Sequence, residues 1–296
     1  MAQRDINMKL KVLVLGSTGL IGHQVFNYLN KTGKYEMYNI TYRKKLNNDT
    51  ILCNIRNQEE FVGVLKTISP DIIVNCIGVL INGANLDPEN AIFINAYMPH
   101  KLMKLSNELN CKLIHISTDC VFSGNKGISY IEEDFKDGKD TYAKSKGLGE
   151  IINDTHLTLR TSVIGPELKS DGEELFHWFM SQSGEIKGFT KAIWSGVTTL
   201  MLAKVVDWSI DKKTTGLYHV TNNKSINKFE LLSLLKKYTR KNISIVPVEG
   251  KIANKSFIDT RKELNFIIPD YEEMVKELVL LMKGNENLYK QYNLGL

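Results

Sequence analysis

The sequence predicts an α/β protein built on a doubly wound parallel sheet, followed by a smaller mixed α/β region. Two observations support this fold class. Short apolar runs alternate with helix-like stretches through the first half of the 296 residues, which is the pattern of consecutive βαβ units. In addition, the first apolar run leads directly into a glycine-rich turn and then a helix-like stretch, as in sheets that bind ligands at the carboxyl ends of their strands.

The expected elements follow from the spacing of apolar residues and from turn residues between them. In the first half we expect strands at 10–15, 38–42, 51–52, 72–76, 112–116 and 157–161, and helices at 20–30, 57–68, 89–110 and 142–153. In the second half we expect helices at 175–181, 200–210, 228–238 and 271–282, and strands at 216–220 and 243–248. Ser225 or Asn227 is expected to cap the helix over 228–238.

The alternation weakens after residue 161, where Gly165-Pro166 and a polar stretch at 169–174 interrupt it. We therefore expect a cofactor-binding domain over 1–162 and a mainly substrate-binding domain over 163–296. A strand near 216–221 is expected to return to the first domain.

Composition and charge exclude several classes of protein. No apolar run approaches the ~20 residues that a membrane helix needs, and the basic residues behind the net charge of +5 are scattered, so neither a membrane nor a nucleic-acid partner is expected. None of Cys53, Cys76, Cys111 and Cys120 forms a CxxC pair, so no metal site is expected. The free cysteines and a polar amino-terminal stretch favour a cytoplasmic location.

The glycine-rich turn reads GSTGLIG over 16–22. Gly16 permits a tight turn, Gly19 lets the backbone approach a pyrophosphate, and Gly22 allows close packing of helix and strand. The start of the following helix offers N–H groups to phosphates. A Rossmann-type dinucleotide site is predicted, with contacts from Gly16, Ser17, Thr18, Gly19, Leu20 and Ile21, and from residues after later strands, namely Asn54, Ile55, Cys76, Ile77 and Gly78.

The second expected strand ends in a basic turn that includes Arg43 and Lys44. An NAD-binding protein would carry an acidic residue here to bind the ribose hydroxyls. Because Arg43 can bind a 2′-phosphate through its forked guanidinium and stack on adenine, we expect NADP(H) as the cofactor, with NADH as the alternative.

Tyr142 and Lys146 lie four residues apart in an expected helix, so they share one face. A phenol ordinarily titrates near ~10, and a neighbouring ammonium group is expected to lower that pKa so that Tyr142 can transfer a proton at neutral pH. Thr118 at the end of a strand is expected to orient the substrate oxygen. These residues are the predicted catalytic group.

The sequence resembles the extended short-chain dehydrogenase/reductases and, more narrowly, the dTDP-4-dehydrorhamnose reductase family of sugar-nucleotide 4-ketoreductases. The resemblance covers nearly the whole chain and is most specific over 115–150. It rests on GSTGLIG at 16–22, NCIG at 75–78, INA at 94–96, HISTDCVFSG at 115–124, YIEED at 130–134, YAKSK at 142–146 and RTS at 160–162. GLYHV at 216–220 and NKF at 227–229 are weaker matches.

The resemblance implies that Thr118, Tyr142 and Lys146 form the catalytic triad and that Asn95 supports the site. It also implies a homodimer and a nucleotide-sugar substrate, with substrate contacts from Asp119, Cys120, Val121 and Phe122.

Two departures from the family pattern bear on the substrate. Cys120 stands where related dehydratases carry Glu, which argues against water elimination. It resembles instead the cysteine of GDP-fucose synthases, which leaves epimerisation open, provided that the thiol pKa is suitable. The segment 187–199 also differs from the usual reductase stretch and is closer to reductases of UDP-linked 2-acetamido-2,6-dideoxy-4-hexuloses. Lys191, Trp194 and Arg261 are our candidates for binding the nucleotide.

The resulting hypothesis is an NADP(H)-dependent reductase of the 4-keto group of a nucleotide-linked 4-keto-6-deoxysugar, in rare-sugar, polysaccharide or glycan biosynthesis. The substrate is either a UDP-2-acetamido-2,6-dideoxy-4-hexulose or a dTDP- or UDP-linked 4-dehydrorhamnose. Two alternatives remain: a bifunctional 3-epimerase/4-reductase that uses Cys120, and a non-enzymatic NADP-binding regulatory subunit.

Overall fold

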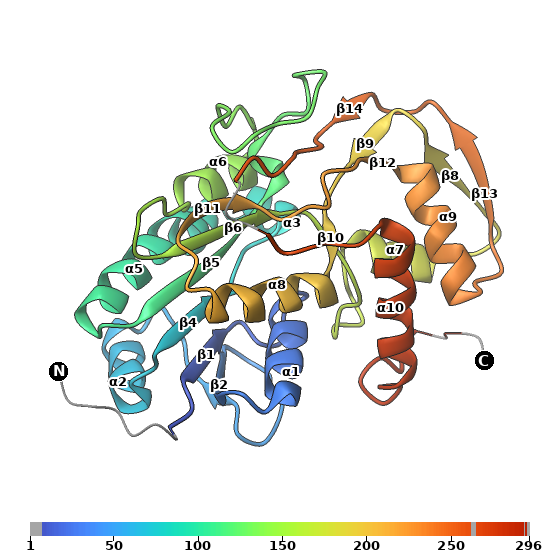
Figure 1. Cartoon of the computed structure of the whole chain (residues 1–296). Coiled ribbons are helices and arrows are strands. Elements are labelled where there is room, and N and C mark those ends of the chain that lie inside the picture. The colour runs from blue at the N-terminus through green and yellow to red at the C-terminus, as the bar shows by residue number, and fades with distance from the viewer. Residues whose placement is uncertain (1–7, 262–264, 293, 295–296) are drawn as a thin grey trace.

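The centre of the molecule is a parallel sheet of seven strands (Figure 1). The computed structural model describes residues 8–261, 265–292 and 294. Across the sheet the order is β11 (Gly216–His219), β6 (Leu157–Thr161), β5 (Lys112–Thr118), β4 (Ile72–Asn75), β1 (Lys11–Leu15), β2 (Glu36–Thr41) and β3 (Ile51–Leu52). The chain runs outward from β1 in one direction and then returns to β4 on the other side, so the carboxyl ends of β1 and β4 flank the crevice where doubly wound sheets bind ligands.

Helices cover both faces of the sheet because successive strand side chains point to opposite sides. Leu13 and Leu15 of β1 pack with α2 (Gln58–Ile68) and α5 (Met98–Glu108) on one face. Val12 and Val14 belong to a larger apolar cluster on the other face with α1 (Gly22–Thr32) and α8 (Thr199–Asp211). The fold class predicted from the apolar alternation is confirmed.

The second half of the chain contributes two elements to this layered core. Strand β11 pairs in parallel with β6 at the sheet edge, and α8 packs along α1. The seven-stranded sheet and its helical cover therefore include β11 and α8, which come from the second half of the chain.

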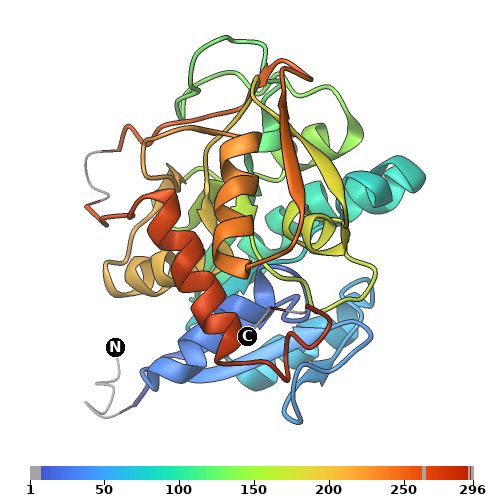
Figure 2. The ribbon, with the colours of Figure 1, turned by 90° about the vertical axis from the view of Figure 1, so that its right-hand side faces the viewer.

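The second region lies to the right of the large sheet in Figure 1. Its helices are α7 (Leu175–Ser181), α9 (Lys228–Thr239) and α10 (Tyr271–Lys283), and α9 and α10 lie side by side (Figure 2). Asn227 caps α9, and a reciprocal contact with Glu230 completes a capping box. Three small sheets pair β8 (Glu185–Phe189) with β13 (Ser244–Val248), β7 (Val163–Ile164) with β10 (Val197–Thr198), and β9 (Ala192–Trp194) with both β12 (Ile226–Asn227) and β14 (Ala253–Asn254).

The expected helix over 89–110 is instead a series of shorter segments. These are α4 (Pro88–Ala91), a π-helix over Ile92–Tyr97 and α5, and they are preceded by α3 (Ile81–Leu86), which was not predicted. The expected helix over 142–153 is α6 (Thr141–Leu148), and it ends at Gly149. A Cβ at Gly149 would lie 1.9 Å from the Asn95 carbonyl oxygen, so glycine permits the close approach of α6 to the π-helix.

None of the helices in the described ranges is long and apolar enough to cross a membrane.

Candidate functional site

The glycine-rich turn between β1 and α1 has the geometry expected of a phosphate-binding loop. Gly16 has a φ of 77°, which favours glycine. A Cβ on Gly22 would lie 2.2 Å from the Gly16 carbonyl oxygen, so only glycine lets α1 begin this close to the turn. The Gly19 N–H donates to that same oxygen at 2.9 Å, which closes the turn.

Two cavities meet at this turn. The first has a volume of about 700 Å³ and the second about 460 Å³. Gly19, Cys76, Ile77 and Gly78 line both of them. A ligand lying across the carboxyl ends of β1 and β4 would therefore reach from one cavity into the other, as a dinucleotide does in this class of sheet.

The first cavity contains most of the predicted cofactor contacts. They are Gly16, Thr18, Gly19, Arg43, Asn54, Ile55, Cys76, Ile77 and Gly78. The Arg43 guanidinium lies 5.0 Å from the Tyr42 ring centre, and both residues line the cavity. Lys44 is not among the lining residues; its carbonyl accepts a hydrogen bond from Thr41 at 2.6 Å. The side chain of Ser17 is buried and donates to Asn39 at 2.7 Å.

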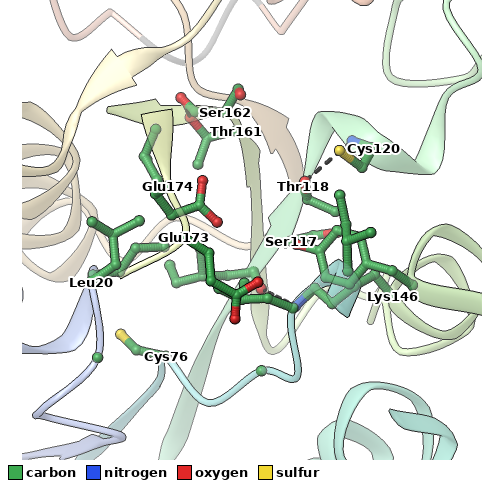
Figure 3. A pocket seen from close by; sticks show the side chains of 18 of the residues that line it. Leu20, Cys76, Ser117, Thr118, Cys120, Lys146, Thr161, Ser162, Glu173 and Glu174 are labelled. Atoms are coloured by element: carbon green, nitrogen blue, oxygen red, sulfur yellow. Dashed lines mark hydrogen bonds between the residues drawn. The ribbon is translucent and has the colours of Figure 1, made fainter. Parts of the chain in front are cut away.

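The second cavity brings together the predicted catalytic group. Thr118, at the end of β5, and Tyr142 and Lys146, on α6, all line it, beside Leu20 and Ile21 of the glycine-rich turn. Figure 3 shows Thr118 and Lys146 on the same side of this cavity. The Thr118 hydroxyl acts to lower the pKa of Tyr142, and the Lys146 ammonium donates to the Ile116 carbonyl at 2.7 Å.

Burial governs the protonation of this group. It raises the pKa of Tyr142 above its usual value, with the Cys120 side chain adding to the rise, although the sequence led us to expect a lowered pKa. The reason is that the phenol is almost fully enclosed, while Lys146 is held against the Ile116 carbonyl. Burial also lowers the pKa of Lys146 to about 8. Tyr142 therefore carries its proton at neutral pH.

Asn95 lies in the π-helix and holds the turn after β4 against α6. Its amide nitrogen donates to the Val79 carbonyl at 2.9 Å and to the Ser145 hydroxyl at 3.2 Å, and its oxygen accepts the Val79 N–H at 2.9 Å. These bonds join the two elements that carry Gly78 and Tyr142. Asn95 thus fixes the cavity walls relative to each other.

The predicted substrate contacts divide into two sets. Asp119 and Cys120 line the second cavity. Val121 and Phe122 are fully buried in a separate apolar cluster with Tyr130 and Phe257, so their side chains hold the loop after β5 and do not face the cavity.

The three residues predicted to bind the nucleotide line neither cavity. Lys191 is exposed. Trp194 is buried, and its indole N–H donates to Ser162 at 2.7 Å. Arg261 forms an ion pair with Glu133 at 3.4 Å.

Two lysines that the sequence analysis did not assign to the site, Lys255 and Lys228, act on Asp119. Burial raises the pKa of Asp119, and the charges of both lysines oppose this rise. Lys255 also opposes the rise in the pKa of the Cys120 thiol. Both lysines are far from β5 in sequence, so the spacing of residues does not show that they approach Asp119.

An acidic loop over 167–174 forms the opposite wall of the second cavity, with Glu167, Lys169, Glu173 and Glu174 among its lining residues (Figure 3). In the sequence this loop is a polar stretch before an expected helix. Acidic residues are common at such positions, so the sequence did not indicate that the loop reaches the cavity.

Comparison with known proteins gives a consistent result. The family model described as "RmlD substrate binding domain" matches residues 9–256. The chain is 30% identical over 159 residues to a dTDP-4-dehydrorhamnose reductase of Escherichia coli K12, which is 52% of this chain and 51% of that enzyme. The match therefore spans only about half the length of that relative.

The chain is also 27% identical over 230 residues to the spore coat polysaccharide biosynthesis protein SpsK of Bacillus subtilis 168. This match covers 76% of the chain and 78% of that protein.

Among solved structures, the fold is similar to a dTDP-4-dehydrorhamnose reductase from Bacillus anthracis in complex with NADP. The TM-score is 0.78 at 26% identity, and the match covers 93% of this chain and 100% of the other.

Proposed function

Because the chain belongs to the RmlD substrate binding domain family, we propose that it reduces the 4-keto group of a nucleotide-linked 4-keto-6-deoxysugar with NADPH. The candidate substrates are a UDP-2-acetamido-2,6-dideoxy-4-hexulose and a dTDP- or UDP-linked 4-dehydrorhamnose, for glycan or polysaccharide biosynthesis. The observation that carries the proposal is the meeting of Thr118, Tyr142 and Lys146 with the glycine-rich turn in one cavity.

The two adjoining cavities fit a dinucleotide, because the glycine-rich turn lies where they meet and Gly19 lines both. A Cβ at Gly16 would lie only 3.0 Å from Ile77 Cγ1, so glycine lets this turn pack closely against the loop after β4. The first cavity would hold the adenosine end, with Arg43 at the 2′-phosphate, and the second would hold the nicotinamide. When bound, NADPH supplies a hydride.

Thr118, Tyr142 and Lys146 would each contribute differently to the reduction. Thr118 would hydrogen-bond the sugar carbonyl and fix its orientation. Tyr142, whose raised pKa keeps it protonated, would donate its proton to the developing alkoxide. Lys146 would hold a nicotinamide ribose hydroxyl from its place against the Ile116 carbonyl.

We further propose that residues 163–296 mainly bind the nucleotide sugar. The acidic loop 167–174 reaches the second cavity from this part of the chain, while β11 and α8 are the exceptions that join the sheet core.

The direct test is to follow NADPH oxidation with UDP- and dTDP-linked 4-keto-6-deoxysugars. We expect turnover with at least one of them. Absence of turnover with all of them, from folded protein that binds NADPH, would refute the proposed reaction.

A second experiment tests the cofactor assignment. Replacing Arg43 with Ala should raise the KM for NADPH by about 10–100-fold, because a charge-assisted contact to the 2′-phosphate is lost. The KM for NADH should rise much less, because NADH loses only the stacking of Arg43 on adenine. Lys44→Ala is the matched control, since Lys44 does not line the cavity, and it should have a much smaller effect. An equal rise for NADPH and NADH in Arg43→Ala would contradict a 2′-phosphate contact.

The environment of Cys120 favours simple reduction over epimerisation. Burial, with the Asp119 charge adding to it, raises the pKa of the thiol to about 12. A 3-epimerase needs a group that removes a proton from carbon, and a thiol with this pKa is almost entirely protonated at neutral pH. We therefore propose reduction alone, with Cys120 packing against the substrate.

A further inference from the structure

The acidic loop 167–174 is held in place by one of its own carboxylates. Glu167 is 2% exposed, and its Oε1 accepts the backbone N–H groups of Glu173 and Glu174, each at 2.9 Å. This arrangement fixes the backbone at the start of α7. The backbone of Glu173 and Glu174 therefore has a defined position in the wall of the second cavity, which both residues line.

The segment that follows α10 braces this loop from behind. The Tyr292 hydroxyl accepts the Glu167 N–H at 3.0 Å and lies 2.8 Å from His177 Nδ1 on α7. Three residues earlier, the Tyr289 hydroxyl lies 3.1 Å from His23 Nε2 on α1. The segment therefore contacts α1 first and then α7, and it lies close to the first elements of the chain (Figure 2).

The carboxylate of Glu174 differs from its two acidic neighbours in being unengaged. Glu167 is bound to backbone N–H groups, and Glu173 accepts a hydrogen bond from Asn82 at 2.6 Å. Within the described ranges, no hydrogen bond or ion pair engages the Glu174 side chain, and Figure 3 shows it directed across the cavity toward Thr118. A free acceptor thus faces the point where the sugar carbonyl is proposed to bind.

The surrounding charges limit what this carboxyl can bind. Burial raises the pKa of Glu174 to about 7, with the Glu167, Asp119 and Glu173 carboxylates adding to the rise and Lys228 opposing it. In its ionised form the Glu174 carboxylate would repel a diphosphate, even with Lys169 in the same wall. The same ionised form would accept a charge-assisted hydrogen bond from a sugar hydroxyl or amide N–H.

We propose that Glu174 is a specificity-determining residue that accepts a hydrogen bond from a donor group on the sugar ring, and so orients the ring with its carbonyl toward Thr118 and Tyr142. The inference rests on the proposed function. It assigns the sugar, and not the diphosphate or the base, to the acidic wall of the second cavity.

The test compares Glu174→Ala with the native protein in two assays. In the first, affinities are measured for UDP-N-acetylglucosamine and dTDP-glucose, which carry no ketone, and for UDP and dTDP alone. We expect the variant to bind the sugar nucleotides about 10–100-fold more weakly, as for a lost charge-assisted hydrogen bond, and to bind UDP and dTDP as the native protein does. In the second, the KM for the ketosugar should rise while the KM for NADPH stays unchanged.

Glu59→Ala is the matched control, since Glu59 is an exposed acidic residue in the first turn of α2 and lines neither cavity. It should match the native protein in both assays. Glu174→Gln keeps the size of the side chain and so controls for misfolding of Glu174→Ala. It should retain part of the sugar affinity because an amide oxygen still accepts a hydrogen bond.

The outcomes distinguish failure of the role proposed for Glu174 from failure of the proposed reaction. Unchanged sugar-nucleotide affinity in Glu174→Ala, or a parallel change for UDP and dTDP alone, would overturn the role of Glu174 and leave the proposed reaction intact. If the native protein neither binds nor reduces any nucleotide sugar, both the reaction and the role of Glu174 are overturned.

Discussion

Replacing Tyr142 with Phe should lower kcat for ketone reduction by about 10²–10⁴-fold, the usual effect of removing a general acid. The variant keeps the aromatic ring that fills the cavity wall and loses only the hydroxyl, so its affinity for NADPH should change little. Stopped-flow measurement of the hydride-transfer step, together with NADPH binding by fluorescence, separates the two effects.

A suitable control is Tyr97→Phe, since Tyr97 is 51% exposed and lines neither cavity. It should react at the native rate. If Tyr142→Phe also reacts at the native rate, Tyr142 is not the proton donor and the assignment of the second cavity as the catalytic site loses its main support.

Replacing Arg160 with Leu should lower the free energy of unfolding by about 3–5 kcal/mol, the cost of leaving a buried charge without its partner. Arg160 is 1% exposed, and its guanidinium binds both carboxylate oxygens of Glu150, at 2.7 and 2.8 Å. It also contacts His219 Nε2 at 2.7 Å. Burial lowers the pKa of that histidine to about 4, so the ring is neutral and accepts this hydrogen bond.

Urea denaturation followed by circular dichroism measures this loss. Lys204→Ala provides the comparison, because Lys204 pairs with Glu277 and both side chains are partly exposed. Solvent-accessible pairs of this kind contribute little to stability. Equal stability of Arg160→Leu and the native protein would show that Glu150 is satisfied by Lys136, which lies 3.1 Å away, and by Ser117.

The sheet of the first half could be predicted from the sequence because its signals are local. Each strand is a short apolar run, and the turn at Gly16 needs a residue that tolerates positive φ. The catalytic group was equally accessible, since Tyr142 and Lys146 are separated by one helical turn and Thr118 directly ends a strand. Local spacing is sufficient to bring such residues together.

The substrate side of the site could not be predicted in the same way. Glu174 reaches the cavity because Glu167 and the segment after α10 fix its loop, and Lys228 and Lys255 approach Asp119 from distant strands and helices. None of these contacts follows from the spacing of neighbouring residues. Trp194 suggested a ligand contact as an aromatic residue, but its indole packs against Tyr271 in the core and bonds to Ser162.

The pairing of β11 with β6 has a consequence for biosynthesis on the ribosome. Until residues 216–219 have emerged, β6 presents an open hydrogen-bonding edge, and before α8 emerges the apolar side of α1 has no cover. Nascent chains with such edges and faces are the ones that associate with one another or recruit chaperones. Assembly of the nucleotide-binding half must therefore await synthesis of β11 at residues 216–219, although the glycine-rich turn at 16–22 is made about 200 residues earlier.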